Sequence, residues 1–210
     1  MFQMNPALIP DTKEILRAKL GCSHVCFTEG LSDLDMVSLD QRCGIDGMIW
    51  FDDSSKIEMV GGELLISAGD TKTFQVKEGT QENWKDDNEV LRPYSTTHTI
   101  TFSPRFLVHG LADFYFKVYS TDSMGIAAVV LAKWRGGLGN ALLARWLEEE
   151  RRAVDKTKRH IREAKKDGRK YFFVTWVTLL RFYRSHLIYI DVCNIDSGLA
   201  TACEDWIKRK

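Results

Sequence analysis

Residues 44–77 read GIDGMIWFDDSSKIEMVGGELLISAGDTKTFQVK, and this stretch decides the fold that we expect. It contains three strand-sized runs rich in aliphatic, aromatic and β-branched residues, at 48–51, 58–67 and 73–77. Turn-forming residues separate these runs, which indicates a meander of three consecutive β-strands.

The rest of the chain predicts helices around this meander and further strands after it. A helix over residues 11–20 has Asp11 or Thr12 as its cap and Gly21 as its end. The other predicted helices are 104–111, a long one at 138–166 and 198–208, and the other predicted strands are 24–28, 114–119, 126–131, 171–180 and 186–192.

The fold class that follows is α/β, with a central mixed sheet of about five or more strands flanked by helices and a long C-terminal basic helix. We expect residues 1–135 to form an α/β core. Residues 136–210 would then be an extension of helix and strand packed on that core, within one compact domain.

The composition is that of a folded chain: 44% of the 210 residues are hydrophobic and 28% are charged, with a net charge of zero. The start of the chain lacks a basic segment followed by an apolar one, and no stretch approaches the ~18 apolar residues of a membrane span. We therefore expect no membrane partner. Five cysteines at irregular spacings favour reduced thiols and a cytoplasmic location.

Candidate chemistry lies at Asp46, before the first strand of the meander, and at Gln75 and Lys77 in the third. Side chains alternate along a strand, so Gln75 and Lys77 share one face while Val76 points to the other. Mg²⁺ and Mn²⁺ prefer oxygen ligands, which the Asp46 carboxylate, the Gln75 amide and the Val76 carbonyl can supply. Lys77 would orient a water molecule or offset charge during phosphodiester hydrolysis.

An Asp on one strand followed by Gln-x-Lys on a later strand resembles the signature of the restriction endonuclease-like, or PD-(D/E)XK, nucleases. An opening helix with an acidic residue, then Gly-Ile-Asp-Gly, a turn and Gln-Val-Lys, is most similar to the Mrr-like branch. The resemblance covers roughly residues 11–80. It implies a restriction endonuclease-like core, with Asp46 and Gln75 at a Mg²⁺ or Mn²⁺ site, Lys77 as the catalytic lysine and Glu14 as an additional metal-site acid.

The same resemblance implies an endonuclease that acts on DNA, with RNA as an alternative substrate, in restriction or defence. A homodimer would allow both strands to be cut. Gln75 departs from the commoner Glu of the signature. The chain is therefore alternatively a non-catalytic module that binds nucleic acid or protein through a degraded nuclease-like site.

Purely structural interpretations of these residues also remain open. Gly-Ile-Asp-Gly is typical of a turn in which Asp46 binds local backbone amides. Gln75 and Lys77 would also fit the solvent-exposed face of an amphipathic strand. A zinc site at Cys22, His24, Cys26 and Cys43 is disfavoured, because the first three would share one strand face, which is awkward for tetrahedral geometry.

The second half of the predicted long helix is strongly basic: residues 151–170 hold ten Lys and Arg residues against three Asp and Glu. Such a run is usually a solvated helical face, but like charges with few acidic neighbours also suit the phosphates of a nucleic acid. The residues expected to contact DNA are Arg151, Arg152, Lys158, Arg159, Arg162, Lys165 and Lys166.

Overall fold

A computed structural model describes residues 4–28, 39, 43–59, 62–80, 99–102, 104–120, 126–152, 159–166 and 169–191. Its helices are α1 (Ile9–Leu20), α3 (Pro104–His109), α4 (Gly139–Arg151) and α5 (Trp176–Phe182), with single turns at Pro6–Leu8, Trp134–Leu138 and Arg184–His186. Its strands are β1 (His24–Phe27), β2 (Gly47–Trp50), β3 (Ser55–Met59), β4 (Gly62–Ile66), β5 (Thr71–Thr80), β6 (Thr99–Phe102), β7 (Phe114–Ser120), β8 (Ile126–Lys133), β9 (Arg162–Lys166), β10 (Arg169–Thr175) and β11 (Leu187–Asp191).

A mixed six-stranded sheet, in the order β1-β2-β5-β7-β8-β11, forms the centre of the molecule. Its neighbouring strands are antiparallel except β5 and β7, which run parallel. A parallel pair needs a long crossover connection, and α3 lies in the segment between these two strands. The predicted α/β class with a mixed central sheet is confirmed.

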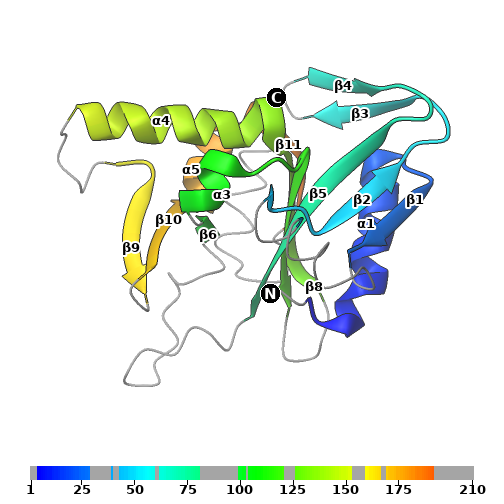
Figure 1. Ribbon diagram of the computed structural model, residues 1–210, viewed down its shortest axis with the longest axis horizontal. Helices are drawn as coiled ribbons and strands as arrows, with labels where there is room; N and C mark the ends of the chain where they lie inside the picture. Colours follow the sequence, from blue (N-terminus) through cyan, green and yellow to red (C-terminus); the bar gives the residue numbers. More distant parts are fainter. Residues whose placement is uncertain are drawn as a thin grey trace.

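The two central strands, β5 and β7, are buried on both faces because alternate side chains enter different hydrophobic clusters. Phe74 and Val76 of β5 join Phe114 and Phe116 of β7 in the cluster that α1 covers. Tyr115 points the other way, into a cluster supplied by β8, β11, α3, α4, α5 and the smaller sheet β6-β10-β9. Figure 1 shows α1 on one side of the central sheet and α3, α4 and α5 on the other.

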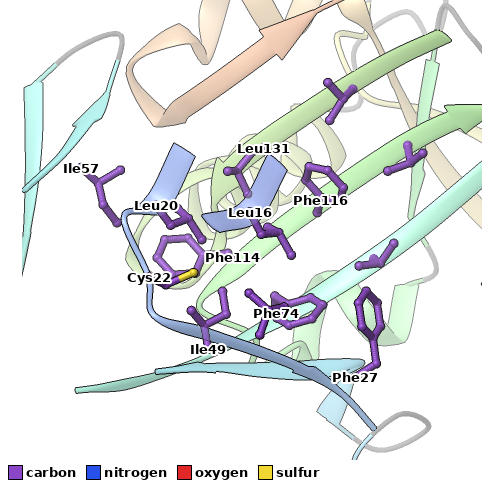
Figure 2. Close-up of a cluster of buried hydrophobic side chains, with 14 of the residues drawn as sticks. Leu16, Leu20, Cys22, Phe27, Ile49, Ile57, Phe74, Phe114, Phe116 and Leu131 are labelled. Atoms are coloured by element: carbon purple, nitrogen blue, oxygen red, sulfur yellow. The ribbon is translucent and has the colours of Figure 1, made fainter. Parts of the chain in front are cut away.

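α1 is held on the sheet by its apolar side. Leu16 and Leu20, one helical turn apart, are fully buried and lie toward Phe114 in Figure 2. Burying a leucine contributes roughly 1.5–3 kcal/mol. The helix begins two residues before the predicted position and ends as expected, because Gly21 adopts a left-handed φ of 66° that other residues rarely accept.

The three-strand meander predicted from residues 48–77 is correct at both ends and wrong in the middle. β2 and β5 pair directly, with Gly47 opposite Phe74. The middle run instead forms the separate hairpin of β3 and β4, in which Ile57 and Ile66 are buried while the other face is largely exposed. Asp46, which precedes β2, therefore lies beside β5.

The single long helix predicted over residues 138–166 is wrong beyond the end of α4 at Arg151. Residues 162–166 are strand β9 and pair with β10, so that Lys166 lies opposite Arg169. The predicted helix end, Asp-Gly, is also a common dipeptide between two paired strands. It lies outside the described residues.

Glu149 provides the physical reason for this departure from a helix. Its Oε1 accepts hydrogen bonds from the His160 backbone amide at 3.0 Å and from Arg145 Nε at 2.9 Å. In a continuous helix residues 149 and 160 would lie about 16 Å apart. The chain after α4 instead returns so that Ile161 is buried in the same cluster as Leu142 of α4.

The strand predicted over residues 171–180 is half correct, because α5 begins at Trp176. Leu179 and Leu180 are buried in the same cluster as Phe172 of β10, and an apolar run does not itself distinguish a strand from a buried helix. Residues 198–208, predicted as a helix, lie outside the described residues. Within the described ranges, no helix is both long enough and apolar enough to cross a membrane.

Replacement of Gly47 tests the close pairing of β1, β2 and β5. A Cβ at this position would lie 2.5 Å from the Cys26 carbonyl oxygen and would overlap the Phe74 ring. We expect Gly47→Ala to lower the free energy of unfolding by ~1–3 kcal/mol, because the strands must separate to admit the methyl group. Denaturant unfolding measures this change, and an unaltered midpoint would contradict the close contact.

Candidate functional site

Asp46 lies where β1, β2 and β5 meet, and hydrogen bonds hold it there. Its backbone amide donates to the Phe74 carbonyl at 2.9 Å, and its carbonyl accepts from the Thr28 amide at 2.9 Å and the Thr28 hydroxyl at 3.1 Å. Its carboxylate Oδ2 accepts a 2.7 Å hydrogen bond from the Val76 amide, 30 residues along the chain. This bond fixes the carboxylate against the middle of β5.

Gln75 is enclosed on the face of β5 that points away from α1, with only 3% of its surface exposed. Its Oε1 has no hydrogen-bond partner among the described residues. An unsatisfied buried polar atom costs roughly 1–3 kcal/mol, so each one requires an explanation. The interpretation of this strand face as solvent-exposed is therefore wrong for Gln75, and a bound cation or hydrogen-bond donor would satisfy its oxygen.

Strand β7 adds two polar side chains on the same face of the sheet. In the parallel register Tyr115 lies opposite Gln75 and Lys117 lies opposite Lys77, and residues paired in this way point to the same side. Tyr115 is fully buried and Lys117 is 8% exposed, whereas Lys77 is half-buried. We call Asp46, Gln75, Lys77, Tyr115 and Lys117 the polar cluster. This cluster reaches the protein surface at Lys77.

Burial dominates the electrostatics of the polar cluster. It lowers the pKa of the Lys117 ammonium from 10.5 to about 8; Lys77 adds to this effect and Glu78 opposes it. Burial also raises the pKa of the Tyr115 hydroxyl, and the negative charge of Asp46 raises it further. Asp46 and Tyr115 are therefore within electrostatic range of each other.

Buried polar side chains are concentrated at this place in the fold. Within the described ranges, those classed as both buried and polar or charged are Thr12, Asp46, Gln75, Lys117 and Glu149. Three of these five belong to the polar cluster. Such a concentration of buried polar groups is typical of functional sites, because a packed core otherwise excludes them.

The remaining predicted metal-site residues divide into two groups. Val76 lies between Gln75 and Lys77, with its side chain in the cluster beneath α1 and its amide bonded to Asp46. Glu14 is exposed on α1, which covers the opposite face of the sheet. The structure thus brings Asp46, Gln75, Val76 and Lys77 together and does not bring Glu14 to them.

The residues predicted to contact DNA do not form one helical face. Arg151 and Arg152 are exposed at the end of α4, and Arg159 forms an ion pair with Glu150. The other four are divided between β9 and the part outside the described ranges: Arg162, Lys165 and Lys166 on β9, and Lys158 outside. The predicted helix that follows a DNA backbone is therefore wrong.

The oxygen atoms of the polar cluster suit a hard cation, but few of them carry the negative charge that would hold it. No group of three or more His, Cys, Asp or Glu side chains that would bind a metal occurs in the described part of the chain. The cluster offers the Asp46 carboxylate and the unpartnered Gln75 oxygen, both of a type that Mg²⁺ and Mn²⁺ prefer. Because the Lys77 and Lys117 ammonium groups lie on the same face and oppose a cation, we expect weak affinity.

Sequence reasoning missed Tyr115 and Lys117, although part of the signal was present. The run Phe-Tyr-Phe-Lys-Val-Tyr at 114–119 contains one charged side chain in an otherwise aromatic and aliphatic strand. Lysine is among the residues least often buried, so its place in such a strand indicates a function or a strong partner. Its position opposite Lys77 depends on the crossover between β5 and β7, which no local pattern specifies.

Comparisons of this chain with protein-family models, with curated proteins and with solved structures found no match.

Substitution of Lys117 tests the cost of its burial. The pKa of Lys117 in the folded protein, about 8, lies below the ordinary 10.5, so below pH 8 the protonated amine opposes folding, and this cost is relieved between pH 8 and 10.5. We expect Lys117→Met to raise the free energy of unfolding by ~1–3 kcal/mol at pH 7, with the gain vanishing near pH 10.5. Thermal unfolding across this pH range measures the effect. A destabilised variant at pH 7 would contradict it.

Proposed function

We propose that this protein is a metal-dependent endonuclease that hydrolyses phosphodiester bonds in DNA. The observation that supports this most is the Asp46 carboxylate, hydrogen-bonded to β5 between the buried Gln75 amide and Lys77. These residue types occur in the chain order of the PD-(D/E)XK signature that the sequence resembles. Asp46, Gln75 and the Val76 carbonyl would bind Mg²⁺ or Mn²⁺.

Each side chain has a separate task in this proposal. A bound metal ion supplies Lewis acidity, which polarises the phosphate and acidifies water. Asp46 contributes the negative charge that attracts the cation, and its hydrogen bond to the Val76 amide fixes its position. Gln75 contributes an oxygen that has no other partner among the described residues. Lys77, the half-exposed member, orients the attacking water or neutralises charge on the phosphate oxygens.

A non-catalytic module that binds nucleic acid or protein through the same cluster is the alternative. Gln75 favours it because an amide holds a divalent cation less strongly than the carboxylate commonly found at this position. Lys117 favours it too, because a second ammonium group on this face of the sheet weakens cation binding. The two functions differ in whether bound DNA is cut.

Cleavage by matched variants tests the nuclease proposal. We expect the wild type to cut plasmid DNA with Mg²⁺ or Mn²⁺, and Asp46→Asn and Lys77→Met to be slower by on the order of 100-fold. Asn retains an acceptor for the Val76 amide, so the fold should persist. Lys72→Met is the control, because Lys72 pairs with Asp70 away from the polar cluster. Wild-type cleavage that is absent, or equally fast in both variants, would refute the assignment.

The identity of residue 75 tests metal binding separately. Gln75→Glu restores a carboxylate, and we expect it to tighten Mn²⁺ binding by about tenfold, which corresponds to ~1.4 kcal/mol. Gln75→Leu, which removes the oxygen donor, should weaken binding. Calorimetric titration with Mn²⁺ measures both effects. If none of the three proteins gives a binding signal, the metal site is wrong and the binding module is favoured.

The setting of this activity is also part of the proposal. We propose DNA restriction or defence in the cytoplasm, where the free thiols of Cys22, Cys26 and Cys43 would remain reduced. A homodimer would present two polar clusters to the two strands of a duplex, and sedimentation in the presence of DNA would detect it.

A further inference from the structure

Lys117 is a charged residue that the proposed nuclease mechanism does not use. It is 8% exposed on a central strand and lies opposite Lys77 on the same face. Taking an ammonium group out of water costs several kcal/mol, and a second ammonium beside it adds repulsion. Methionine has a similar length and would fill this position without either cost. A role in packing alone therefore gives no reason for a lysine here.

The balance of charge in the polar cluster favours an anion. Two ammonium groups, Lys77 and Lys117, accompany one carboxylate, Asp46, and Gln75 is neutral. One oxygen of the Asp46 carboxylate is already bonded to a backbone amide. Glu78, the other acid that acts on Lys117, accepts a 2.9 Å hydrogen bond from the Asn5 amide at the start of the chain. Glu78 alternates with Lys77 and so belongs to the other face of β5, and on the face of the polar cluster two ammonium groups accompany one carboxylate. Partial desolvation strengthens the attraction of these ammonium groups for an anion.

We propose that Lys77 and Lys117 together bind one phosphate group of a nucleic acid backbone directly, without a divalent cation. Adjacent strands lie ~4.8 Å apart, so two lysines in register on one face can approach two oxygens of the same phosphate. Lys77 is half-exposed, so it would meet the phosphate first, and buried Lys117 lies opposite it on β7. Such binding goes beyond the nuclease proposal and does not require cleavage.

Salt dependence of DNA binding in the presence of EDTA tests this proposal. The affinity for a fluorescently labelled duplex is measured by anisotropy over a series of NaCl concentrations. Wild-type protein should bind, and the double variant Lys77→Met/Lys117→Met should reduce the slope of log affinity against log salt by ~0.9, the value for one phosphate contact. Because both lysines share that phosphate, each single variant should reduce the slope by less than this. Lys72→Met removes an equal charge from β5 outside the cluster and should leave the slope unchanged. Thermal unfolding of each variant verifies its fold.

A parallel titration with inorganic phosphate identifies the source of the phosphate group. If both lysine variants lose the heat of phosphate binding but keep the wild-type slope for DNA, the lysines bind the free ion and the proposal of a nucleic acid ligand is overturned. Slopes and phosphate binding that are unaltered in both variants would overturn the proposal, as would wild-type binding only when Mg²⁺ is added. Lysine-dependent binding in EDTA without Mg²⁺-dependent cleavage would refute the nuclease proposal and support the phosphate site. Mg²⁺-dependent cleavage with unaltered slopes in the lysine variants would support the nuclease proposal and refute the phosphate site.

Discussion

Burial of strands β5 and β7 on both faces is the constraint on which the candidate site depends. One set of alternate side chains packs beneath α1, and Phe74 and Phe114 are almost completely enclosed there. The other set points into the opposite layer of helices, so polar residues at those positions leave water as well. Gln75 and Lys117 are thereby desolvated, which makes their chemistry differ from that of the same residues on a surface strand.

Because the polar cluster is desolvated, the numbers of its positive and negative groups decide which ion it attracts. A carboxylate at residue 75 would have balanced one ammonium group, whereas the amide leaves Asp46 as the one carboxylate in a polar cluster that contains Lys77 and Lys117. A cation is attracted by Asp46 and by the Gln75 oxygen, which has no partner among the residues that the structure describes, and it is repelled by the lysines. A phosphate experiences the opposite forces. The proposed nuclease and the proposed phosphate site therefore use the same geometry, and they differ in how strongly a metal ion would be held.

The region where sequence reasoning failed illustrates how tertiary contacts override a local pattern. Residues 151–166 contain good helix formers, and their propensity favours continuing α4. Glu149 instead binds the amide of His160, and Ile161 enters the core, so the chain turns back and forms β9. The gain from burying Ile161 and pairing with β10 exceeds a helix preference of only tenths of a kcal/mol per residue.

The sequence alone determined the alternation that places Gln75 and Lys77 on one face, the end of α1 at Gly21, and most strands of the central sheet, because these depend on local periodicity and turn residues. It did not determine that β2 pairs directly with β5, or that β7 joins β5 in parallel with Lys117 opposite Lys77. The first pairing connects residues 21 to 27 positions apart and the second connects residues 40 positions apart, and both result from the packing of whole layers. Only the tertiary structure could therefore place an acid, an amide and two amines together, since register between distant strands has no signature within either strand.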